Sequence, residues 1–201
     1  MSTPIQYLPM FPLGIFMLPH EQIPLHIFEP RFKQLFDDLA QGDTRFGLPI
    51  TEPDGANLVS ICKLNEVTKQ KDNGERDVII ECIQVAELFR IDDQMSGKLY
   101  PGGEVGSLIE FDMNTTASVE VLELFADYIE LRFGRRPKLI EIKNYSLTDV
   151  AACLALSNEN KVRFAKAKNV KAQQKMIVGL IEYLRFLFYQ ETKTENGIIL
   201  N

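Results

Sequence analysis

The sequence predicts an α+β fold in two parts: a mostly antiparallel β part over residues 1–112 and a helical bundle over residues 113–201. In the first part, short stretches rich in Val, Ile, Leu and Phe alternate with turn residues, as is typical of strands. In the second part, apolar residues recur at three- and four-residue spacing, as is typical of helices. The charge changes at the same place: 9 Lys+Arg against 18 Asp+Glu give −9 before residue 113, and 13 against 10 give +3 after it.

The first part is expected to be mostly β, with one helix after the first strand and four further strands after the helix. Pro30 fits the first turn of the helix and Gly42 follows its end. The apolar face of this helix is formed by Phe32, Leu35, Phe36 and Leu39. A polar stretch with Asn73-Gly74 at its tip joins the middle two strands and predicts a hairpin. The four strands are expected over residues 45–51, 58–68, 77–91 and 98–111.

The second part is expected to contain three or four helices. Thr116 is a candidate N-cap for the first of them, and Gly134 is a candidate stop signal. Ser146 and Asp149 have the spacing of a capping box at the start of another helix. A long last helix is predicted by apolar residues that recur on one side between residues 177 and 188.

Composition excludes several classes of protein. The net charge of −6, from 22 Lys+Arg and 28 Asp+Glu, argues against a polybasic nucleic-acid binder. No stretch resembles a signal peptide or a membrane-spanning helix. Three cysteines are too few for a secreted disulfide framework, so a cytoplasmic location is expected.

No pattern predicts catalysis, a cofactor or a metal. Ser60 and Lys63 have Ser-x-x-Lys spacing, but in a strand residues three apart point to opposite faces. His20 and His26 have no further Cys or His nearby in the sequence that could complete a zinc site. Cys62 and Cys82 lie on neighbouring predicted strands, where reduced packing is favoured over a redox pair. We therefore expect a protein that is not an enzyme.

One segment resembles a known family. It comprises Leu8-Pro9-Met10-Phe11-Pro12-Leu13, then Leu18-Pro19, and then Pro24-Leu25-His26-Ile27-Phe28-Glu29-Pro30-Arg31-Phe32. These residues resemble the opening of the Lon protease substrate-binding (N-terminal) domain. Weaker similarity continues through three later stretches, which are residues 73–79, 88–91 and 161–164.

The resemblance implies a PUA-like β-barrel followed by a helical bundle. It also implies non-catalytic recognition of unfolded or tagged polypeptides, as a substrate-binding or adaptor domain in proteolysis. The sequence has no Gly-x-x-x-x-Gly-Lys-[Ser/Thr] loop for an ATPase, so the resemblance implies a stand-alone member of the family. Such a domain would act as an oligomer or together with a protease or chaperone machine, because one small apolar site binds weakly.

The candidate peptide-binding surface is the apolar segment near the N-terminus together with the entry to the first helix. An extended chain would turn some of these apolar side chains outward, where they need a partner. Two alternatives remain open: the helical part covers the segment, and Glu29 pairs with Arg31. The predicted peptide-binding residues are Phe11, Leu13, Phe16, Met17, Glu29, Arg31 and Phe32.

A lysine-rich stretch between residues 160 and 175 contains no acidic residue. If one helix carried it, Lys161, Lys168 and Lys175 would share a face, with Lys171 nearby. A solvated helix face, or a contact for an acidic partner or for the molecule's own acidic half, is the favoured interpretation. The competing function is an RNA-binding PUA-like module that uses residues 161–175.

Overall fold

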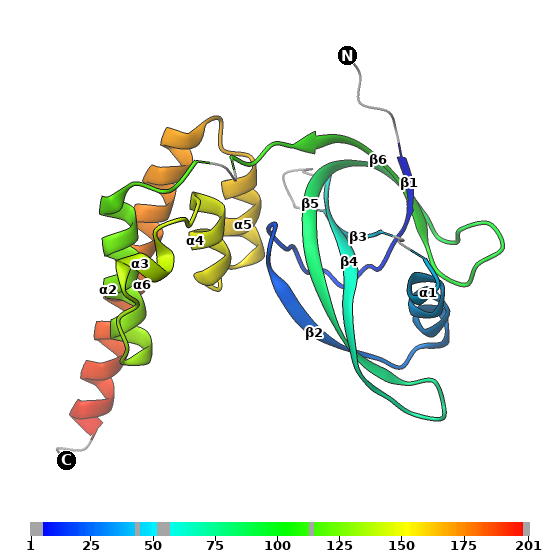
Figure 1. The fold of residues 1–201 in the computed structure, drawn as a ribbon, viewed down its shortest axis with the longest axis horizontal. Coiled ribbons are helices and arrows are strands. Elements are labelled where there is room, and N and C mark those ends of the chain that lie inside the picture. Colours follow the sequence, from blue (N-terminus) through cyan, green and yellow to red (C-terminus); the bar gives the residue numbers. More distant parts are fainter. Residues whose placement is uncertain (1–5, 43–44, 52–56, 113–114, 199–201) are drawn as a thin grey trace. The chain divides into compact units, whose positions relative to one another are not determined.

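The structure is a computed structural model that describes residues 6–42, 45–51, 57–112 and 115–198. The chain divides into two compact units, shown in Figure 1. Unit 1 comprises residues 1–110 and 156–166, and unit 2 comprises residues 111–155 and 167–201. The structure therefore groups residues 156–166 with the β part, whereas the sequence analysis assigned them to the helical part. Residues 113 and 114, at the expected boundary, lie outside the described residues.

Unit 1 is built on an antiparallel sheet of six strands in the order β1-β6-β5-β4-β3, with β2 paired to β5. The long strand β5 pairs with β4 along one edge, and with β2 and then β6 along the other. The strands are β1 (Gln6–Pro9), β2 (Gln22–Ile27), β3 (Phe46–Thr51), β4 (Asn57–Gln70), β5 (Arg76–Asp92) and β6 (Gly102–Ile109). The antiparallel α+β class is confirmed.

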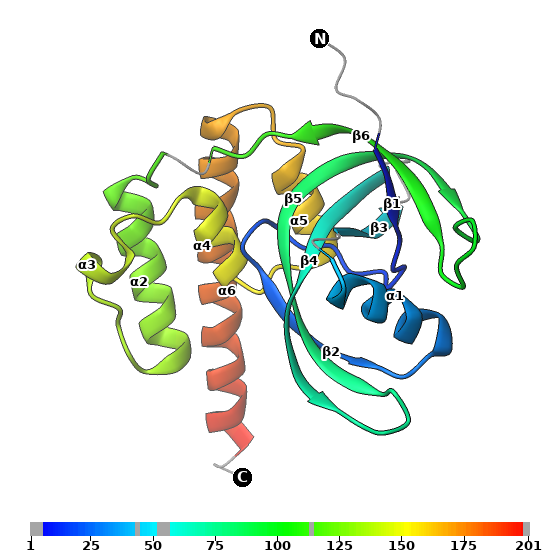
Figure 2. The ribbon, with the colours of Figure 1, turned by 45° about the vertical axis from the view of Figure 1, so that its right-hand side comes forward.

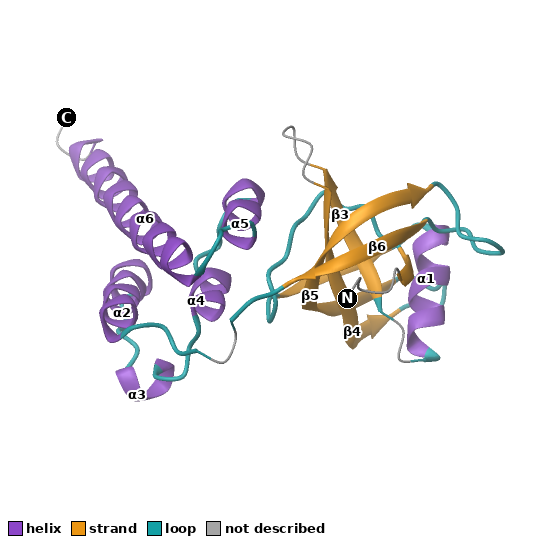
Figure 3. Ribbon diagram, turned by 90° about the horizontal axis from the view of Figure 1, so that it is seen from above, coloured by secondary structure: helices purple, strands orange, loops and turns teal. Residues whose placement is uncertain are grey.

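The sheet is not closed into a barrel by strand pairing. Within the described residues, its two outermost strands, β1 and β3, are joined only by an isolated parallel bridge between Met10 and Gly47. The expected barrel is therefore not confirmed. Figure 3 shows how strongly the strands curve and cross around the interior of unit 1.

Strands β3 to β6 correspond to the four expected strands. The expected helix is α1 (Pro30–Ala40), which begins at Pro30 and buries the predicted face formed by Phe32, Leu35, Phe36 and Leu39. Phe11 joins this face, because its ring centroid lies 4.2 Å from that of Phe32. Burial of these aromatic side chains holds α1 on the sheet.

Unit 2 is helical. Its helices are α2 (Val119–Phe133), α3 (Leu139–Ile142), α4 (Leu147–Cys153) and α6 (Val170–Ile198). Figure 2 shows α2 and α6 side by side. The helix α5 (Asn158–Ala165) belongs to unit 1. No helix among the described residues is both long and apolar enough to cross a membrane.

Local signals explain the ends of these helices. Gly134 ends α2 in the left-handed region, with φ of 74°, and donates its N–H to the Glu130 carbonyl. Ser146 and Asp149 form the predicted capping box of α4. The predicted cap of α2 was wrong: Ser118 accepts the Val121 N–H, whereas Thr116 bridges to Ser146.

Residues 11–21, all of which are described, form no strand and cross unit 1 as an irregular segment. On one side, Ser60 of β4 fixes Met17. The Met17 N–H donates to Ser60 Oγ at 2.9 Å, and the same hydroxyl donates to the Met17 carbonyl at 2.8 Å. Ser60 and Met17 are fully buried, so these hydrogen bonds also satisfy groups that water cannot reach.

Helix α5 holds the other side of this segment. The Phe16 N–H donates to Asn158 Oδ1 at 3.0 Å, and Asn158 Nδ2 donates to the Gly14 carbonyl at 2.8 Å. Lys161 forms an ion pair with Glu21 at 2.7 Å, and the two side chains are only 12% and 10% exposed. Glu21 also accepts the Leu18 N–H. Four residues of the crossing segment are thus tied to α5, directly or through Glu21.

We predict that Lys161→Met lowers the free energy of unfolding of unit 1 by about 3 kcal/mol, because it leaves the Glu21 carboxylate buried without its cation. Urea denaturation of the purified chain measures this change. The control is Lys175→Met, at an exposed position on α6, which should change stability by less than about 0.5 kcal/mol. Equal stability of the two variants would contradict the prediction.

Candidate functional site

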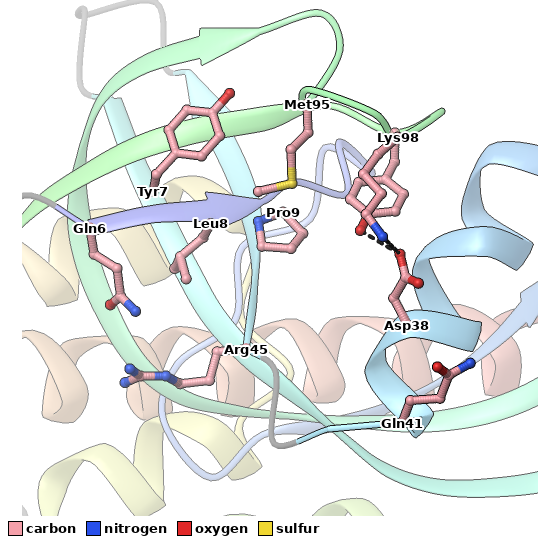
Figure 4. Close-up of a pocket in the computed structure, with 10 residues that line it drawn as sticks. Gln6, Tyr7, Leu8, Pro9, Asp38, Gln41, Arg45, Met95 and Lys98 are labelled. Atoms are coloured by element: carbon pink, nitrogen blue, oxygen red, sulfur yellow. Dashed lines mark hydrogen bonds and ion pairs between the residues drawn. The ribbon is translucent and has the colours of Figure 1, made fainter.

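An open pocket of about 480 Å³ lies in unit 1 beside the edge of β1 that faces away from β6. Figure 4 shows that its lining comes from parts of the chain that are distant in sequence. These are β1, the last turn and C-cap of α1, Arg45 just before β3, and the loop between β5 and β6. The lining residues are Gln6, Tyr7, Leu8, Pro9, Asp38, Gln41, Arg45, Met95, Lys98 and Tyr100.

The loop between β5 and β6 forms one wall of the pocket, and hydrogen bonds to neighbouring residues fix this loop. The Leu99 N–H donates to Gln34 Oε1 of α1 at 2.7 Å, and the Met95 N–H donates to the Tyr100 carbonyl at 2.8 Å. Gly97 takes φ of 73° in this turn, a conformation that other residues rarely adopt. The loop is therefore an ordered wall of the pocket.

The backbone of β1 turns hydrogen-bonding groups toward the pocket. The Met10 N–H donates to the Pro101 carbonyl on the β6 side, and the Phe11 N–H donates to the Gly47 carbonyl on the opposite side. Because backbone groups alternate along a strand, Tyr7 and Pro9 direct theirs away from β6. Pro9 has no N–H, and its carbonyl accepts the Gly47 N–H in the parallel bridge between Met10 and Gly47. This edge therefore offers one donor and one acceptor, both from Tyr7, which no ladder or bridge among the described residues pairs on this side.

Asp38 forms the polar centre of the opposite wall. Its Oδ2 accepts hydrogen bonds from Lys98 Nζ and from the Tyr100 hydroxyl, both at 2.7 Å (Figure 4). The bond from Lys98, and next the bond from Tyr100, lower the pKa of Asp38. Burial, and next the bond to Asp38, raise the pKa of Tyr100. At neutral pH the carboxylate is therefore charged and the phenol is protonated, which suits a fixed binding wall.

The side chain of Tyr7 lies against β6. Its hydroxyl donates to Asp92 Oδ2 at 2.8 Å, which is the main reason that the pKa of Tyr7 is raised. A Cβ atom at Gly102 would lie 2.5 Å from the Tyr7 hydroxyl oxygen, so only glycine leaves room for this ring against β6. The side chain of Tyr7 is thus occupied with Asp92, while its backbone faces the pocket.

The sequence model of the ATP-dependent protease La (LON) substrate-binding domain matches residues 7–182. The chain belongs to this family. Its fold is similar to that of a Lon N-terminal domain protein from Xanthomonas campestris, with a TM-score of 0.63 and 20% identity over 87% of this chain and 98% of that one. The N-terminal domain of a Mycobacterium avium complex Lon protease gives a TM-score of 0.59 and 14% identity over 88% and 98%. A search among curated proteins gives no match.

The structure of this Lon-family chain changes the interpretation of the predicted peptide-binding segment. Four of the seven residues, Phe11, Phe16, Met17 and Phe32, are between 0 and 4% exposed. These four side chains are covered or fixed by α1, Ser60 and α5, which agrees with the covered alternative that the sequence left open. None of the seven lines the pocket.

The other three predicted residues are exposed. Leu13 is 36% exposed in the irregular segment. Glu29 accepts a hydrogen bond from Arg31 Nε at 2.9 Å, so these two side chains pair with each other, which is one of the alternatives left open by the sequence. The Arg31 guanidinium also lies 4.4 Å from the centre of the Phe32 ring.

The predicted lysine face does not exist as a single helix. Lys161 lies on α5 in unit 1 and is paired with Glu21. Lys168, Lys171 and Lys175 are exposed and belong to unit 2. The helix stops at Ala165, and a new one begins where Asn169 Oδ1 accepts the Ala172 N–H at 2.9 Å. The cap at Asn169 is the signal that the sequence analysis overlooked.

Cys62, Cys82 and His26 do not have the arrangement of a reactive centre. Cys62 and Cys82 lie opposite each other on β4 and β5, and both are fully buried. The hydrogen bond with Cys82, and next burial, raise the pKa of Cys62 well above its usual value, which disfavours the reactive thiolate. His26 pairs with Asp77 across β2 and β5. Among the described residues, no group of three or more His, Cys, Asp or Glu side chains has the arrangement of a metal site.

Sequence reasoning missed the pocket residues because no local pattern marks them. Pro9 was noticed only as part of the family resemblance, although a proline next to an apolar strand also indicates an edge strand. Arg45 was treated as the start of a strand. Their meeting depends on where β1 leaves the sheet and on how α1 docks, and neither can be deduced from spacing.

We predict that Asp38→Asn lowers the free energy of unfolding by about 1 kcal/mol at neutral pH, since it removes a charged acceptor that is partly exposed. Asp38 has a lowered pKa in the folded state, so its contribution is present above the ordinary value of 3.8 and is lost as the pH falls through the lowered value. Chemical denaturation between pH 7 and pH 3 measures the difference between variant and wild type. A difference that stays constant over this range would contradict the prediction.

Proposed function

We propose that this chain binds extended polypeptide segments without catalysis, as a substrate-binding or adaptor domain in proteolysis, and that the pocket beside β1 is the binding site. The observation that carries the proposal is the backbone of Tyr7, which lines an open pocket of about 480 Å³ and which no ladder or bridge among the described residues pairs on the side away from β6. Membership of the Lon substrate-binding family supports the kind of ligand. An added strand is a common way of binding a peptide.

Backbone pairing explains selectivity for unfolded chains. A segment in a folded protein already has its N–H and C=O groups paired, whereas an unfolded segment can present them to the Tyr7 backbone. Every residue type except proline has the same groups, so the recognition tolerates many sequences. Leu8, Pro9 and Met95 supply an apolar wall, and the flexible thioether of Met95 adapts to different side chains.

The expected affinity of one such site is low. Two hydrogen bonds contribute about 0.5–1.5 kcal/mol each, and one buried apolar side chain contributes about 1.5–3 kcal/mol. Together they give roughly 2.5–6 kcal/mol, against an association cost of at least about 4 kcal/mol. The proposed role therefore needs several copies, or a partner protease or chaperone machine, to reach a useful affinity.

The exposed residues of the sequence-based prediction form a second part of the proposal. Leu13, Glu29 and Arg31 remain accessible, and Phe28 beside them is 57% exposed. This surface offers apolar and charged contacts but no unpaired strand edge from β1, so we assign it a secondary role in binding polypeptides.

RNA binding remains the competing function, and nothing in the described residues favours it. The basic residues that suggested it are divided between the two units, and Lys161 is already neutralised by Glu21. Retention on heparin with steep salt dependence would favour RNA binding over the polypeptide proposal.

We predict that Tyr7→Pro weakens polypeptide binding about fivefold or more compared with Tyr7→Ala. Both variants lose the Tyr7 side chain, but only proline removes the N–H that faces the pocket, and this N–H has no partner on β6. Fluorescence anisotropy with a labelled, reduced and alkylated model polypeptide measures binding. Thermal unfolding of each variant shows whether it is folded at the assay temperature.

Gln41→Trp gives a second test that does not alter β1. Gln41 is exposed at the C-cap of α1 and lines the pocket, so an indole at this position should obstruct entry while leaving the fold intact. Leu13→Asp in the same assay tests the secondary surface. Unchanged binding by both Tyr7→Pro and Gln41→Trp would remove the pocket from the proposal.

A further inference from the structure

Arg45 gives the pocket a positive charge that the described residues do not neutralise. The pocket lining contains two cations, Arg45 and Lys98, and one anion, Asp38. Lys98 is paired with Asp38 at 2.7 Å, so its charge is already balanced. No ion pair involves Arg45 within the described part of the chain, and its side chain is half-buried. A ligand that enters the pocket therefore meets one uncompensated guanidinium.

We propose that this pocket selects polypeptide segments that carry a carboxylate next to an extended backbone, and that Arg45 binds this carboxylate. This inference rests on the proposed function, since it names the chemical class of segment that the same site prefers. A guanidinium has parallel N–H donors that match the two oxygens of a carboxylate, and a charge-assisted pair of this kind is stronger than a neutral hydrogen bond. Partial burial of Arg45 reduces the screening by water.

The surroundings of Arg45 fit a carboxylate. Figure 4 shows the side chains of Gln6 and Gln41 among the residues that line the pocket with Arg45. Their amide groups are able to donate hydrogen bonds to carboxylate oxygens and carry no charge that would compete. Asp38 is the one anion in the lining, and it is occupied by Lys98 and Tyr100. The pocket therefore attracts a single negative charge.

The shape of the pocket favours the end of a chain over its interior. The bridge between Met10 and Gly47 closes the edge of β1 at one end, so a bound strand cannot continue along β1 past Met10. Among the described residues, the open edge is that of β1 (Gln6–Pro9), and Tyr7 is the residue whose backbone groups face it. A short terminal segment fits this space, and of the two chain ends only the carboxyl end is attracted by Arg45. Aspartate or glutamate within a segment is the other source of the same chemistry.

The test uses an octapeptide of Val, Ser and Thr with a fluorescent label at its N-terminus. It is prepared with a free carboxyl end, with an amidated end, and with an amidated end plus one internal aspartate. Each peptide is titrated into the full chain by fluorescence anisotropy, and amide chemical shifts of the labelled protein report which residues respond. The variants are Arg45→Gln, which removes the charge, and Arg45→Lys, which keeps the charge but loses the parallel donors.

For the wild type, we expect the free-acid peptide to bind about tenfold or more tightly than the amidated peptide. Arg45→Gln should bind both peptides with the affinity of the amidated one, and Arg45→Lys should keep part of the preference. The preference should also decrease as salt is added. If the internal aspartate restores tight binding to the amidated peptide, the carboxylate is confirmed as the recognised group and the terminus is not required.

Two outcomes would overturn the inference, and they can be told apart from a failure of the proposed function. If the wild type binds the acid and amide peptides equally, or if Arg45→Gln keeps the preference, carboxylate selection is wrong while polypeptide binding stands. If no peptide binds and the unfolded polypeptide does not bind either, the proposed function fails together with the inference. Unfolding curves of Arg45→Gln and the wild type exclude loss of folding as the cause.

Discussion

The buried ion pair between Lys161 and Glu21 is the constraint on which the arrangement of unit 1 depends. Lys161 comes from a helix that begins at residue 158, and Glu21 ends the irregular segment that follows β1. A pair of charges this far from water is tolerated only when each has its partner. The pair therefore ties α5 to the β part of the chain, together with the Asn158 hydrogen bonds to Gly14 and Phe16. This is the physical reason that residues 156–166 group with unit 1.

The same constraint explains why the open site lies beside β1. Strand β1 ends at Pro9, and residues 11–21 are then fixed by Ser60 and α5 instead of extending the sheet. Within the described residues, the outer edge of β1 consequently meets β3 only at the Met10–Gly47 bridge. An edge left open in this way normally has to be protected against association with other chains. Here it lies in a pocket with a charged wall, which restricts what can pair with it.

The sequence predicted those features that depend on neighbouring residues. The start of α1 at Pro30, its buried apolar face, the stop at Gly134 and the capping box at Ser146 each follow from residues within one or two turns. The burial of Phe16 does not follow from neighbouring residues, because Asn158, which accepts the Phe16 N–H, is 142 positions away in the sequence. An apolar run also has the same pattern whether its outer side is covered or exposed. The pocket was missed for a similar reason, since Arg45, Tyr7 and Lys98 become neighbours only after α1 and the loop before β6 have docked.

Backbone pairing and carboxylate binding make complementary contributions to recognition. Pairing with the Tyr7 backbone distinguishes unfolded from folded segments but depends little on their sequence, whereas Arg45 adds selectivity for one charge. Neither contribution alone exceeds the cost of association by much. A site of this strength releases its ligand quickly, so a domain that delivers polypeptides to another machine can hand them on without a separate release step. Such a role is therefore suited by low affinity in each copy and by higher affinity when several copies act together.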